Sequence, residues 1–503
     1  MYRVAARVGC MTRSGSVYPA LLAVTMAAAA LFYPQFSLNH DSSWYLVATR
    51  MLLAGERLYV GVVEINPPLV FYLTAPALYL ADLTGLSDTR AYLYYAIALG
   101  GLSSLWLSQI VRRSSLESAA QDVLLLAGLV GIFLLPVGEF GQREHFLLIF
   151  ALPYLYRLIL GDRAPQVALA EKVALGLFAF LGLALKPYFL LIPAAIVLAG
   201  PFRSLFKRII DPANLALGCS LLAYAGFIMT AHPEYLTQIA PLATRVYSSF
   251  GFTPTGVLLR SEMLALACLV PIYFWKGAPA DGVTLRLLGA AGGSLASYLV
   301  QFKGWNYQII PSSFFLMLGG VWLLWAKSAI PRRDLLLGVL AAMVVFLTLG
   351  RQLERGPYQA GTSATFSNYV ERPDEGILVL SSNVSAAFPF VNEVKGRWSS
   401  RFPTQWLIPG AMVGLKTADC RAQSDACATF ERILADARTA IVEDMARHRP
   451  DLVFIDVRQE KSYFEGLPFD YLGFLHEDPA FAPLWMHYRL EGEVIGYQVW
   501  KLR

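Results

Sequence analysis

Charged residues of both signs lie in short polar segments that separate long apolar stretches of this 503-residue chain. Asp41 follows the first apolar stretch, and Glu144 stands beside Arg143 at the start of a later one. Lys186 and Lys303 stand in two further short polar segments. A carboxylate can take a proton from a hydroxyl, and Lys and Arg bind phosphate groups. Together these residue types suit a reaction in which a hydroxyl displaces a phosphate.

Each of these residues also has a purely structural explanation. Asp41 could cap the helix that follows it, since Asp is common at that position. The two lysines could extend toward lipid headgroups, as long basic side chains do at a membrane surface. The segment Gly138–His145 could be a charged turn, but charges close to apolar spans are costly and usually serve a function. We therefore expect a functional role there, and both explanations stay open for Asp41, Lys186 and Lys303.

Four more residues in polar segments are candidates for orienting a substrate. They are Glu64, His145, Trp305 and Tyr307. Glu64 precedes a pair of prolines that fix an extended backbone, so a structural turn is the alternative for this segment. The other three are close in sequence to Glu144 or Lys303 and add an imidazole and two aromatic rings.

The elements that must position these residues are predicted to cross a lipid bilayer. Hydrophobic residues make up 56% of the chain and charged residues only 15%, whereas a soluble chain has about 25% charged residues. A span requires roughly 20 apolar residues, and about eleven segments approach this length. They are Val17–Phe36, Ala91–Val111, Val123–Val137, Phe146–Leu160, Val173–Leu185, Tyr188–Gly200, Leu215–Ala231, Met263–Trp275, Leu285–Val300, Ile309–Trp325 and Leu335–Gly350. We therefore predict a multi-span α-helical membrane protein.

The distribution of Lys and Arg predicts the orientation, because cytoplasmic loops are enriched in both residues. If the short apolar segment Leu69–Leu83 lies at the membrane interface, every basic cluster falls on one side. If it crosses, all later clusters move outside. The residues concerned are Arg112, Arg113, Arg163, Lys172, Arg203, Lys207, Arg208, Lys276, Lys327, Arg332 and Arg333. We therefore predict an interfacial helix at Leu69–Leu83, with the candidate residues on the outer face.

Charged residues become frequent after about residue 350, and no later apolar stretch is long enough to span a bilayer. We predict a polytopic membrane domain over residues 1–350, with residues 37–68 as its catalytic outer loop. Residues 351–503 are predicted to form a soluble α/β domain in the periplasm. Its predicted elements are the strands Gly376–Ser381 and Asp451–Val457, the helix Ala428–His448, and an alternating edge strand Val494–Leu502.

Two of the five cysteines, Cys420 and Cys427, stand close together in this soluble part. Outside the cytoplasm a disulfide between them is expected. Two free thiols remain the alternative, because a sequence does not supply the geometry that a disulfide needs.

The sequence lacks the motifs of several classes of enzyme and binding protein. There is no G-x-G-x-x-G, no G-x-x-x-x-G-K-[ST], no H-E-x-x-H and no C-x-x-C, which argues against dinucleotide chemistry, ATP hydrolysis and a structural zinc site. The net charge of +5 is explained by cytoplasmic loops, so no nucleic-acid partner is predicted. The D-x-D pair that nucleotide-sugar enzymes use is also missing. On the outer face, the residues favour transfer of a sugar from a lipid phosphate to a hydroxyl, with cations stabilising the leaving phosphate.

The segments that carry these residues resemble the GT-C membrane glycosyltransferases, in particular the protein O-mannosyltransferase and lipid A aminoarabinose transferase group. The resemblance covers Val17 to Gly350 in layout and rests on the order and spacing of short motifs. The motifs are Asp41 after the first span, AGERLYVGVVEINPPLVFYL, GQREHFLLIF and KGWNYQIIP.

The resemblance implies a GT-C fold and a glycosyltransferase that uses a polyprenyl-phosphate sugar donor and inverts the anomeric carbon. It implies Asp41 as the catalytic base and Glu144 as an assisting carboxylate. Many mannosyltransferases carry a second acid where this chain has Ser42. Arg143, Lys186 and Lys303 are then expected to bind the donor phosphate. The resemblance does not specify a cofactor, since some GT-C enzymes need a divalent metal and many do not.

The expected partners are a polyprenyl-phosphate sugar, membrane lipid and an acceptor hydroxyl on a glycan, a lipid or a protein. The expected location is a bacterial inner membrane. A transporter or flippase of lipid-linked glycans is one alternative, although transporters place their ionisable residues near the bilayer midplane. A glycan ligase or polymerase on the same face is another. A non-catalytic assembly protein that acts through its C-terminal domain is a third.

Overall fold

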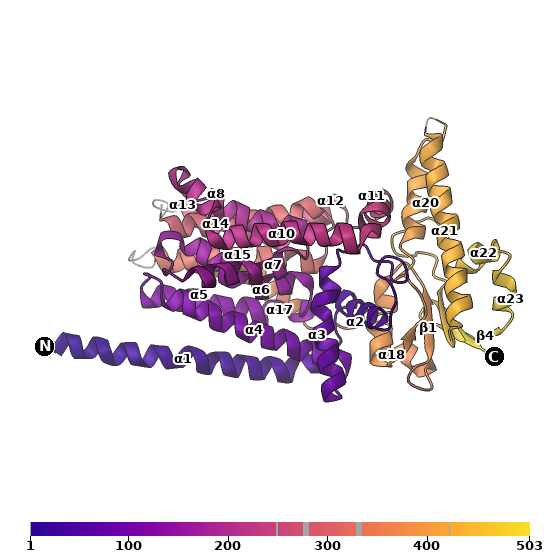
Figure 1. Ribbon diagram of the computed structural model, residues 1–503, viewed down its shortest axis with the longest axis horizontal. Coiled ribbons are helices and arrows are strands. Elements are labelled where there is room, and N and C mark those ends of the chain that lie inside the picture. Colours follow the sequence, from indigo (N-terminus) through magenta and orange to yellow (C-terminus); the bar gives the residue numbers. More distant parts are fainter. Residues whose placement is uncertain (1, 248–249, 275–280, 328–333, 422) are drawn as a thin grey trace. The chain divides into compact units, whose positions relative to one another are not determined.

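The computed structural model describes residues 2–247, 250–274, 281–327, 334–421 and 423–503. The chain forms two compact units, whose elements are labelled in Figure 1. The first comprises Met1–Phe36, Arg90–Ala225 and Phe252–Tyr358; the second comprises Ser37–Thr89, Gly226–Gly251 and Gln359–Arg503. The predicted cytoplasmic residues Lys276, Arg332 and Arg333 lie outside the described residues.

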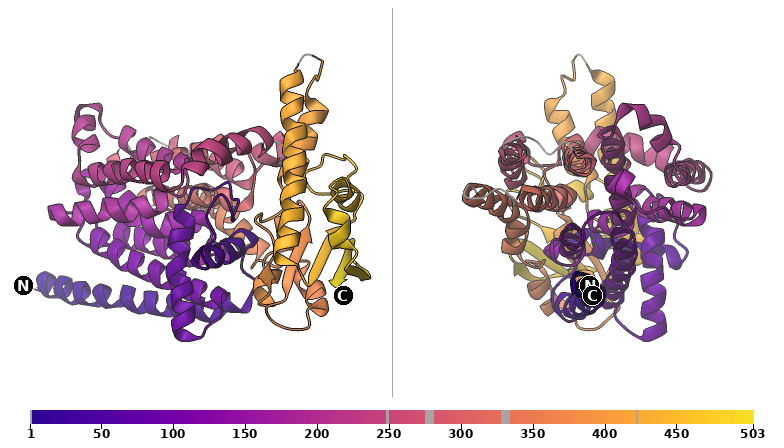
Figure 2. Two further views of the ribbon diagram at one scale, coloured as in Figure 1. Left: turned by 45° about the vertical axis from the view of Figure 1, so that its right-hand side comes forward. Right: turned by 90° about the vertical axis from the view of Figure 1, so that its left-hand side faces the viewer.

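The first unit is a bundle of helices that run side by side, as the views in Figure 2 show. Its main helices are α1 (Tyr2–Phe32), α4 (Asp88–Arg112), α5 (Ser118–Leu129), α6 (Arg143–Leu160), α7 (Leu169–Leu183), α8 (Leu191–Leu198), α10 (Pro212–Ala231), α13 (Ser261–Phe274), α14 (Gly282–Gln301), α15 (Ile310–Lys327) and α16 (Asp334–Val345). The short helices α9 (Leu205–Ile209), α12 (Pro254–Leu258) and α17 (Arg351–Arg355) lie in its connections.

Seven helical segments of the described chain are long and apolar enough to cross a bilayer, or up to eight if one bent helix pair counts as a span. They are Val17–Gln35, Asp88–Arg112, Arg143–Arg163, Pro212–Ala231, Gly282–Gln301, Asn306–Ala326 and Leu335–Arg355. The multi-span helical architecture predicted from the sequence is confirmed. The remaining predicted spans fall in shorter helices, such as α7 with 15 residues and α13 with 14 residues, where a straight span needs roughly 20.

Helix α6 is more enclosed by protein than any other of these segments. Within its apolar window 83% of the residues are buried, compared with 17% for α10 and 28% for Leu335–Arg355. A helix that faces lipid exposes most of its apolar side chains, whereas α6 contacts protein all round. The charged residues in the first turn of α6 are therefore surrounded by neighbouring helices and not by lipid.

The second unit joins the segment after α1 to the C-terminal domain. Its helices are α2 (His40–Leu53), α3 (Leu69–Thr84), α11 (Ala240–Val246), α18 (Ser363–Phe366), α19 (Phe390–Glu393), α20 (Leu407–Thr417), α21 (Ser424–His448), α22 (Tyr471–His476) and α23 (Phe481–Trp485). Helix α3 has 16 residues, which gives about 24 Å at 1.5 Å per residue. This is shorter than the roughly 30 Å of a hydrocarbon core, and the interfacial location of α3 remains a prediction.

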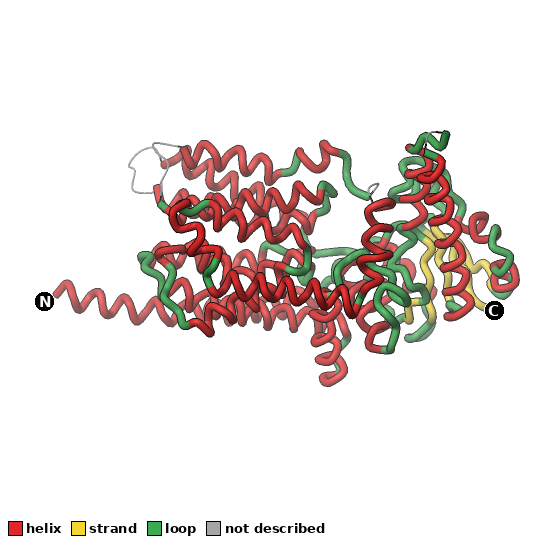
Figure 3. Tube along the Cα trace, turned by 45° about the horizontal axis from the view of Figure 1, so that its top comes forward, coloured by secondary structure: helices red, strands yellow, loops and turns green. Residues whose placement is uncertain are grey.

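The strands of the second unit form one five-stranded sheet in the order β2-β1-β3-β5-β4, drawn in yellow in Figure 3. The strands are β1 (Gly376–Leu380), β2 (Arg397–Trp398), β3 (Leu452–Asp456), β4 (Tyr488–Val494) and β5 (Tyr497–Leu502). Strands β2, β1 and β3 are parallel, with Leu378 opposite Val453, and β5 is antiparallel to β3. Phe454 of β3 packs against Phe366 at 4.2 Å and Phe390 at 5.5 Å between ring centres, which places α18 and α19 on the same face.

The strands predicted at Gly376–Ser381 and Asp451–Val457 and the helix at Ala428–His448 are confirmed as β1, β3 and α21. The prediction of an edge strand at Val494–Leu502 is wrong. Strand β5 lies inside the sheet, because β4, which was not predicted, pairs with its other side. The alternating pattern of β5 reflects one covered and one open sheet face and does not distinguish an edge strand from an inner one.

The predicted outer loop 37–68 belongs to the same compact unit as the C-terminal domain. The backbone N–H of Val63 donates to the carbonyl of Arg401 at 2.7 Å. Glu56 pairs with Arg447 at 2.6 Å. This loop is thus organised by contacts with residues that follow it by more than 300 positions.

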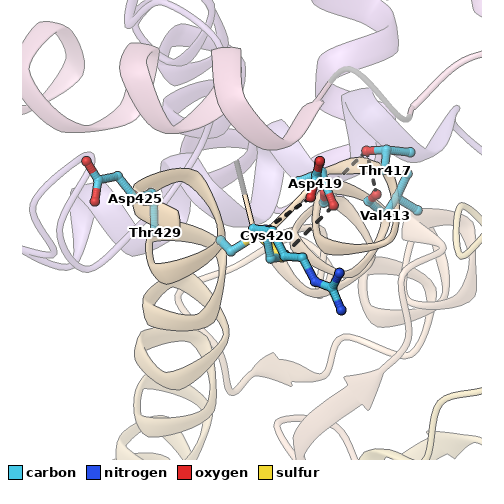
Figure 4. The surroundings of a disulfide bond; sticks show 10 residues. Val413, Thr417, Asp419, Cys420, Asp425 and Thr429 are labelled. Atoms are coloured by element: carbon cyan, nitrogen blue, oxygen red, sulfur yellow. Dashed lines mark hydrogen bonds between the residues drawn. A yellow bond between two sulfur atoms is a disulfide. The ribbon is translucent and has the colours of Figure 1, made fainter. Parts of the chain in front are cut away.

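A disulfide joins Cys420 and Cys427 across the connection between α20 and α21, as Figure 4 shows. Cys219 and Cys268 are free thiols in the first unit.

Candidate functional site

Glu144 and Lys186 form a buried ion pair at one end of the helical bundle. Glu144 lies in the first turn of α6, and Lys186 follows the end of α7. The two helices pack closely because Gly182 has no side chain, and a Cβ there would lie 3.0 Å from the Cβ of Phe150. The Lys186 ammonium donates to Glu144 Oε1 at 2.6 Å, with the two side chains 5% and 0% exposed. The pair is therefore enclosed in protein.

Glu144 lies at the N-terminal end of α6. The side chain of Gln142 caps the helix by accepting from the Arg143 N–H at 3.4 Å. A negative charge in the first turn is stabilised by the positive end of the helix dipole. Glu144 Oε2 is buried and has no hydrogen-bond partner among the described residues. This oxygen is suited to accept a hydrogen bond from a bound hydroxyl.

The ring of Tyr307 lies close to both Arg143 and Lys186. Its buried ring lies 4.9 Å from the Lys186 ammonium and 5.8 Å from the Arg143 guanidinium carbon. Cations at such distances are attracted by the electron-rich face of an aromatic ring. Gln301, at the end of α14, accepts a further hydrogen bond from Lys186 at 3.3 Å. Trp305 stands beside Tyr307, with 5.8 Å between the ring centres.

Lys303 lies on the short connection between α14 and Tyr307. Its backbone carbonyl accepts from the Phe252 N–H at 2.9 Å, and the chain turns through left-handed conformations at Phe302 and Gly304. Burial lowers the pKa of the Lys303 ammonium. The connection that carries Lys303 thus leads directly into the Arg143–Lys186–Tyr307 cluster.

Both ring nitrogens of His145 bond to backbone groups. Its Nδ1 accepts from the Gly141 N–H at 2.9 Å, which leaves the proton on Nε2, and Nε2 bonds to the Ile132 carbonyl at 2.8 Å. The side chain is fully buried. Both ring nitrogens are occupied by backbone groups, so His145 fixes the turn before α6. Its sequence position next to Glu144 could not reveal this, because consecutive helical residues point in different directions.

The cluster of Arg143, Glu144, Lys186 and Tyr307 combines two cations with one carboxylate. Burying a charge is expensive unless it is paired and hydrogen-bonded, and the contact between Lys186 and Glu144 meets this condition. Two cations beside one carboxylate suit an anion that brings its own hydroxyl groups, such as a sugar phosphate. Among the described residues, no group of three or more His, Cys, Asp and Glu side chains could hold a metal ion.

Asp41, in the second unit, does not cap its helix. Asn39 is the N-cap residue of α2, and its side chain accepts from the Asp41 N–H at 2.9 Å. The helix-cap explanation of Asp41 is therefore wrong. The Asp41 side chain is 20% exposed, and His40 Nε2 lies 3.5 Å from its Oδ1. Its carboxylate lies in the first turn of α2, near the positive end of the helix dipole.

Glu64 connects the outer loop to the helix that carries Asp41. Its Oε2 accepts from the indole N–H of Trp44 on α2 at 2.6 Å, and its Oε1 accepts from the side-chain amide of Asn66 at 2.6 Å. The Ile65 N–H also donates to Oε1, at 2.7 Å. Hydrogen bonds to an ionised group are strong, so Glu64 fixes the outer loop against α2, and its role in orienting a substrate stays a prediction.

Some residues that were not candidates in the sequence contact candidate site residues in the structure. Gln301 contacts Lys186, and Trp44 contacts Glu64. Tyr463, in the loop after β3, is influenced by Asp41: burial, with a smaller effect of the Asp41 charge, raises the pKa of its phenol. No sequence signal links Tyr463 to Asp41, because they are far apart in the chain and belong to no common motif.

No family model matches this chain, and no curated protein sequence matches it. Solved structures do match. The crystal structure of ArnT from Cupriavidus metallidurans bound to undecaprenyl phosphate is 12% identical, with a TM-score of 0.51, over 97% of this chain and 98% of that chain. The archaeal oligosaccharyltransferase AglB from Archaeoglobus fulgidus, in complex with an inhibitory peptide and a dolichol-phosphate, is 10% identical, with a TM-score of 0.44, over 94% of this chain and 72% of that chain. The similarity to ArnT extends over nearly the whole of both chains, and it confirms that this protein has the GT-C fold predicted from its sequence.

Proposed function

We propose that this protein is a membrane glycosyltransferase that moves a sugar from a polyprenyl-phosphate donor to an acceptor hydroxyl on the periplasmic face. The observation that carries the proposal is the Glu144–Lys186 ion pair, buried beside Arg143 around Tyr307 at the end of an apolar helical bundle. A lipid-linked phosphate places a charged headgroup where its apolar chain ends, so its binding site needs cations at the end of the apolar helical bundle.

In this reaction the acceptor oxygen attacks the anomeric carbon of the sugar, and the bond from that carbon to the phosphate oxygen breaks. The hydroxyl proton passes to Asp41, and the electron pair of the broken bond remains on the lipid phosphate. Attack on the side opposite the leaving phosphate inverts the anomeric carbon. Removal of the proton by a positioned base typically contributes about 10²- to 10⁴-fold to the rate.

Arg143, Lys186 and Lys303 are assigned to the donor phosphate, whose negative charge increases as the bond breaks. Cations fixed before the reaction stabilise that charge without reorganising. Glu144 is assigned two tasks: its Oε1 holds the Lys186 ammonium, and its Oε2 accepts a hydroxyl of the sugar. Trp305 and Tyr307 complete the wall beside the cations.

Two further findings support this assignment. ArnT, whose fold this chain shares, was crystallised with undecaprenyl phosphate. The disulfide between Cys420 and Cys427 fits an oxidising compartment, which agrees with a C-terminal domain in the periplasm and a bacterial inner-membrane location. The acceptor hydroxyl belongs to a glycan, a lipid or a protein.

The test measures label moved from radiolabelled polyprenyl-phosphate sugars in membranes that contain the wild-type protein or Asp41→Asn. We expect transfer by the wild type and a loss of at least about 10²-fold in Asp41→Asn at equal expression. Asp82→Asn is the matched control, because Asp82 is an exposed carboxylate of the same unit. Equal transfer by Asp41→Asn and wild type would reassign the base. Movement of donor lipid across the membrane without transfer by the wild type would favour a flippase, and transfer of whole oligosaccharides would favour a ligase or polymerase.

A further inference from the structure

The sequence GPFRSLFKRII, which joins α8 to α10, contains three basic residues that the proposed reaction does not use. Arg203, Lys207 and Arg208 are interleaved with Phe202 and Phe206. Phenylalanine and basic side chains on one short segment are typical of chain that lies in the interface between a membrane and water. Such a segment is suited to contact lipid headgroups.

The segment turns sharply away from α8. The apolar helix pair Pro187–Leu198 and Phe202–Ile209 is bent by 114°. The first helix stops here because Pro201 lacks a backbone N–H and disfavours a helical conformation of the residue before it. Helix α10, which is long and apolar enough to cross a bilayer, begins soon afterwards at Pro212. Because charges inside the hydrocarbon are costly, this crosswise basic segment at the start of a span is expected at the surface of the bilayer.

Arg208 holds the bend in place. Its Nε donates to the Val197 carbonyl at 3.0 Å, and its Nη1 donates to the Pro201 carbonyl at 2.9 Å. Nη1 also donates to the Ser204 hydroxyl at 2.5 Å. A Cβ at Gly200 would lie 2.8 Å from the guanidinium carbon, so the guanidinium packs directly on the backbone of the bend. Three hydrogen bonds and this close packing define the direction of the segment.

The far end of the segment is fixed to the start of α10 and to α6. The Asn214 side-chain amide donates to the Arg208 carbonyl at 2.7 Å, and its Oδ1 accepts from the Tyr154 hydroxyl on α6 at 2.7 Å. Asp211 pairs with Arg157 of α6 at 2.9 Å. The segment is therefore anchored at both ends and presents its other side chains in fixed directions.

The side chains that face outward are the two phenylalanines and the two remaining basic residues. Phe202 is 85% exposed and Phe206 is 71% exposed. Arg203 and Lys207 are exposed as well, and neither forms an ion pair or a side-chain hydrogen bond with another described residue. Since residues four apart lie on the same side of a helix, the segment carries an apolar row beside a basic row.

We infer that residues 202–210 form a binding surface for anionic phospholipids of the bilayer. Phe202 and Phe206 enter the boundary between headgroups and acyl chains, and Arg203 and Lys207 bind the headgroup phosphates. The positive charge favours anionic lipids over neutral ones. The inference goes beyond the proposed function, because none of these residues is assigned to the donor or to the acceptor.

The test uses the full-length protein in detergent micelles, with an environment-sensitive fluorophore on Ile210→Cys, an exposed position just after α9. The cysteines outside the disulfide are replaced by serine. Titration with phosphatidylglycerol should change the fluorescence in a saturable way. Arg203→Gln/Lys207→Gln should raise the half-saturating concentration about 25-fold, since each basic residue near an anionic surface contributes about fivefold. Arg421→Gln/Arg432→Gln removes the same charge from exposed positions of the second unit and should leave that concentration unchanged.

Equal curves for phosphatidylglycerol and phosphatidylcholine would overturn the inference, and so would a Arg203→Gln/Lys207→Gln variant that titrates like the wild type. An identical fluorescence change with inorganic phosphate alone would also overturn it, because the segment would then bind a free anion and not a lipid surface. These outcomes do not depend on sugar transfer, so the proposed function stands or falls separately.

A second measurement needs no charge variant. The protein labelled at position 210 is reconstituted into vesicles of phosphatidylethanolamine and phosphatidylglycerol that carry a quencher either near the headgroup or deep in the acyl chain. We expect stronger quenching from the shallow position, since interfacial segments lie at that depth. Stronger quenching from the deep position would mean that the segment enters the hydrocarbon core. Quenching by aqueous iodide alone would mean that it faces water. Either result would overturn the inference.

Discussion

Glu144 accepts a 2.6 Å hydrogen bond from Lys186, and neither side chain is more than 5% exposed. Lys186→Met would leave an uncompensated buried carboxylate, so we expect a loss of about 3–5 kcal/mol in the free energy of unfolding. The double variant Glu144→Gln/Lys186→Met should regain most of that stability but bind undecaprenyl phosphate much more weakly than wild type. Unfolding midpoints and lipid binding in detergent measure the two effects.

The Arg157–Asp211 pair provides the control for this experiment, since it belongs to the same unit and is joined by a 2.9 Å contact. Asp211→Asn should reduce stability without weakening lipid binding. Normal lipid affinity in the Glu144→Gln/Lys186→Met variant would show that the pair is only structural.

If Lys303 binds the lipid phosphate, the affinity for that phosphate should fall at alkaline pH. Burial lowers the pKa of its ammonium below the ordinary value of 10.5. Below the lowered pKa the charge is present and supports binding; as pH rises through that pKa, the charge and its contribution are lost. We expect affinity for undecaprenyl phosphate to fall about tenfold across this range, as for the loss of one charged hydrogen bond. Lys303→Arg should keep its affinity, because arginine stays charged. Parallel pH curves for both proteins would contradict the assignment.

The Cys420–Cys427 disulfide should stabilise the ends of α20 and α21 and little else. The bond closes a short loop, with a sequence separation of 7, and so constrains few residues of the unfolded chain. Reduction, or Cys420→Ser with Cys427→Ser, should speed hydrogen exchange at the C-terminal end of α20 and the first turn of α21, while β1 and β3 keep their protection. Cys219→Ser removes a free thiol and should change nothing. Global acceleration of exchange would mean that the disulfide holds the whole domain together.

Gly410 should be essential for the packing of α11 on α20. A Cβ at this position would lie 2.2 Å from the Val246 carbonyl oxygen, so α11 would have to move. We expect Gly410→Ala to cost about 1–3 kcal/mol, as for other overpacked sites, and to displace the adjacent Tyr247. Gly361→Ala is the control, since a Cβ there meets nothing within 4 Å. Hydrogen exchange of α11 reports the displacement; equal exchange in the two variants would show that α11 accommodates the added methyl group.

The sequence alone determined the helical membrane architecture, the C-terminal α/β domain and its elements β1, β3 and α21. These elements can be predicted from local composition. A membrane span needs an apolar stretch as long as the bilayer is thick, and a buried strand needs a short apolar run. The candidate charged residues could also be identified from the sequence, since they lie in short polar segments between long apolar stretches. The similarity to ArnT then confirmed the GT-C fold.

The tertiary structure alone decided which charges act together and which are structural. Glu144 and His145 are adjacent in sequence, yet one pairs with Lys186 and the other bonds two backbone groups, because successive residues of a helix point in directions about 100° apart. Asn39 is the N-cap residue of α2, which removes the structural alternative for Asp41. The inner position of β5 depends on how distant segments pack, and no local pattern records such long-range contacts.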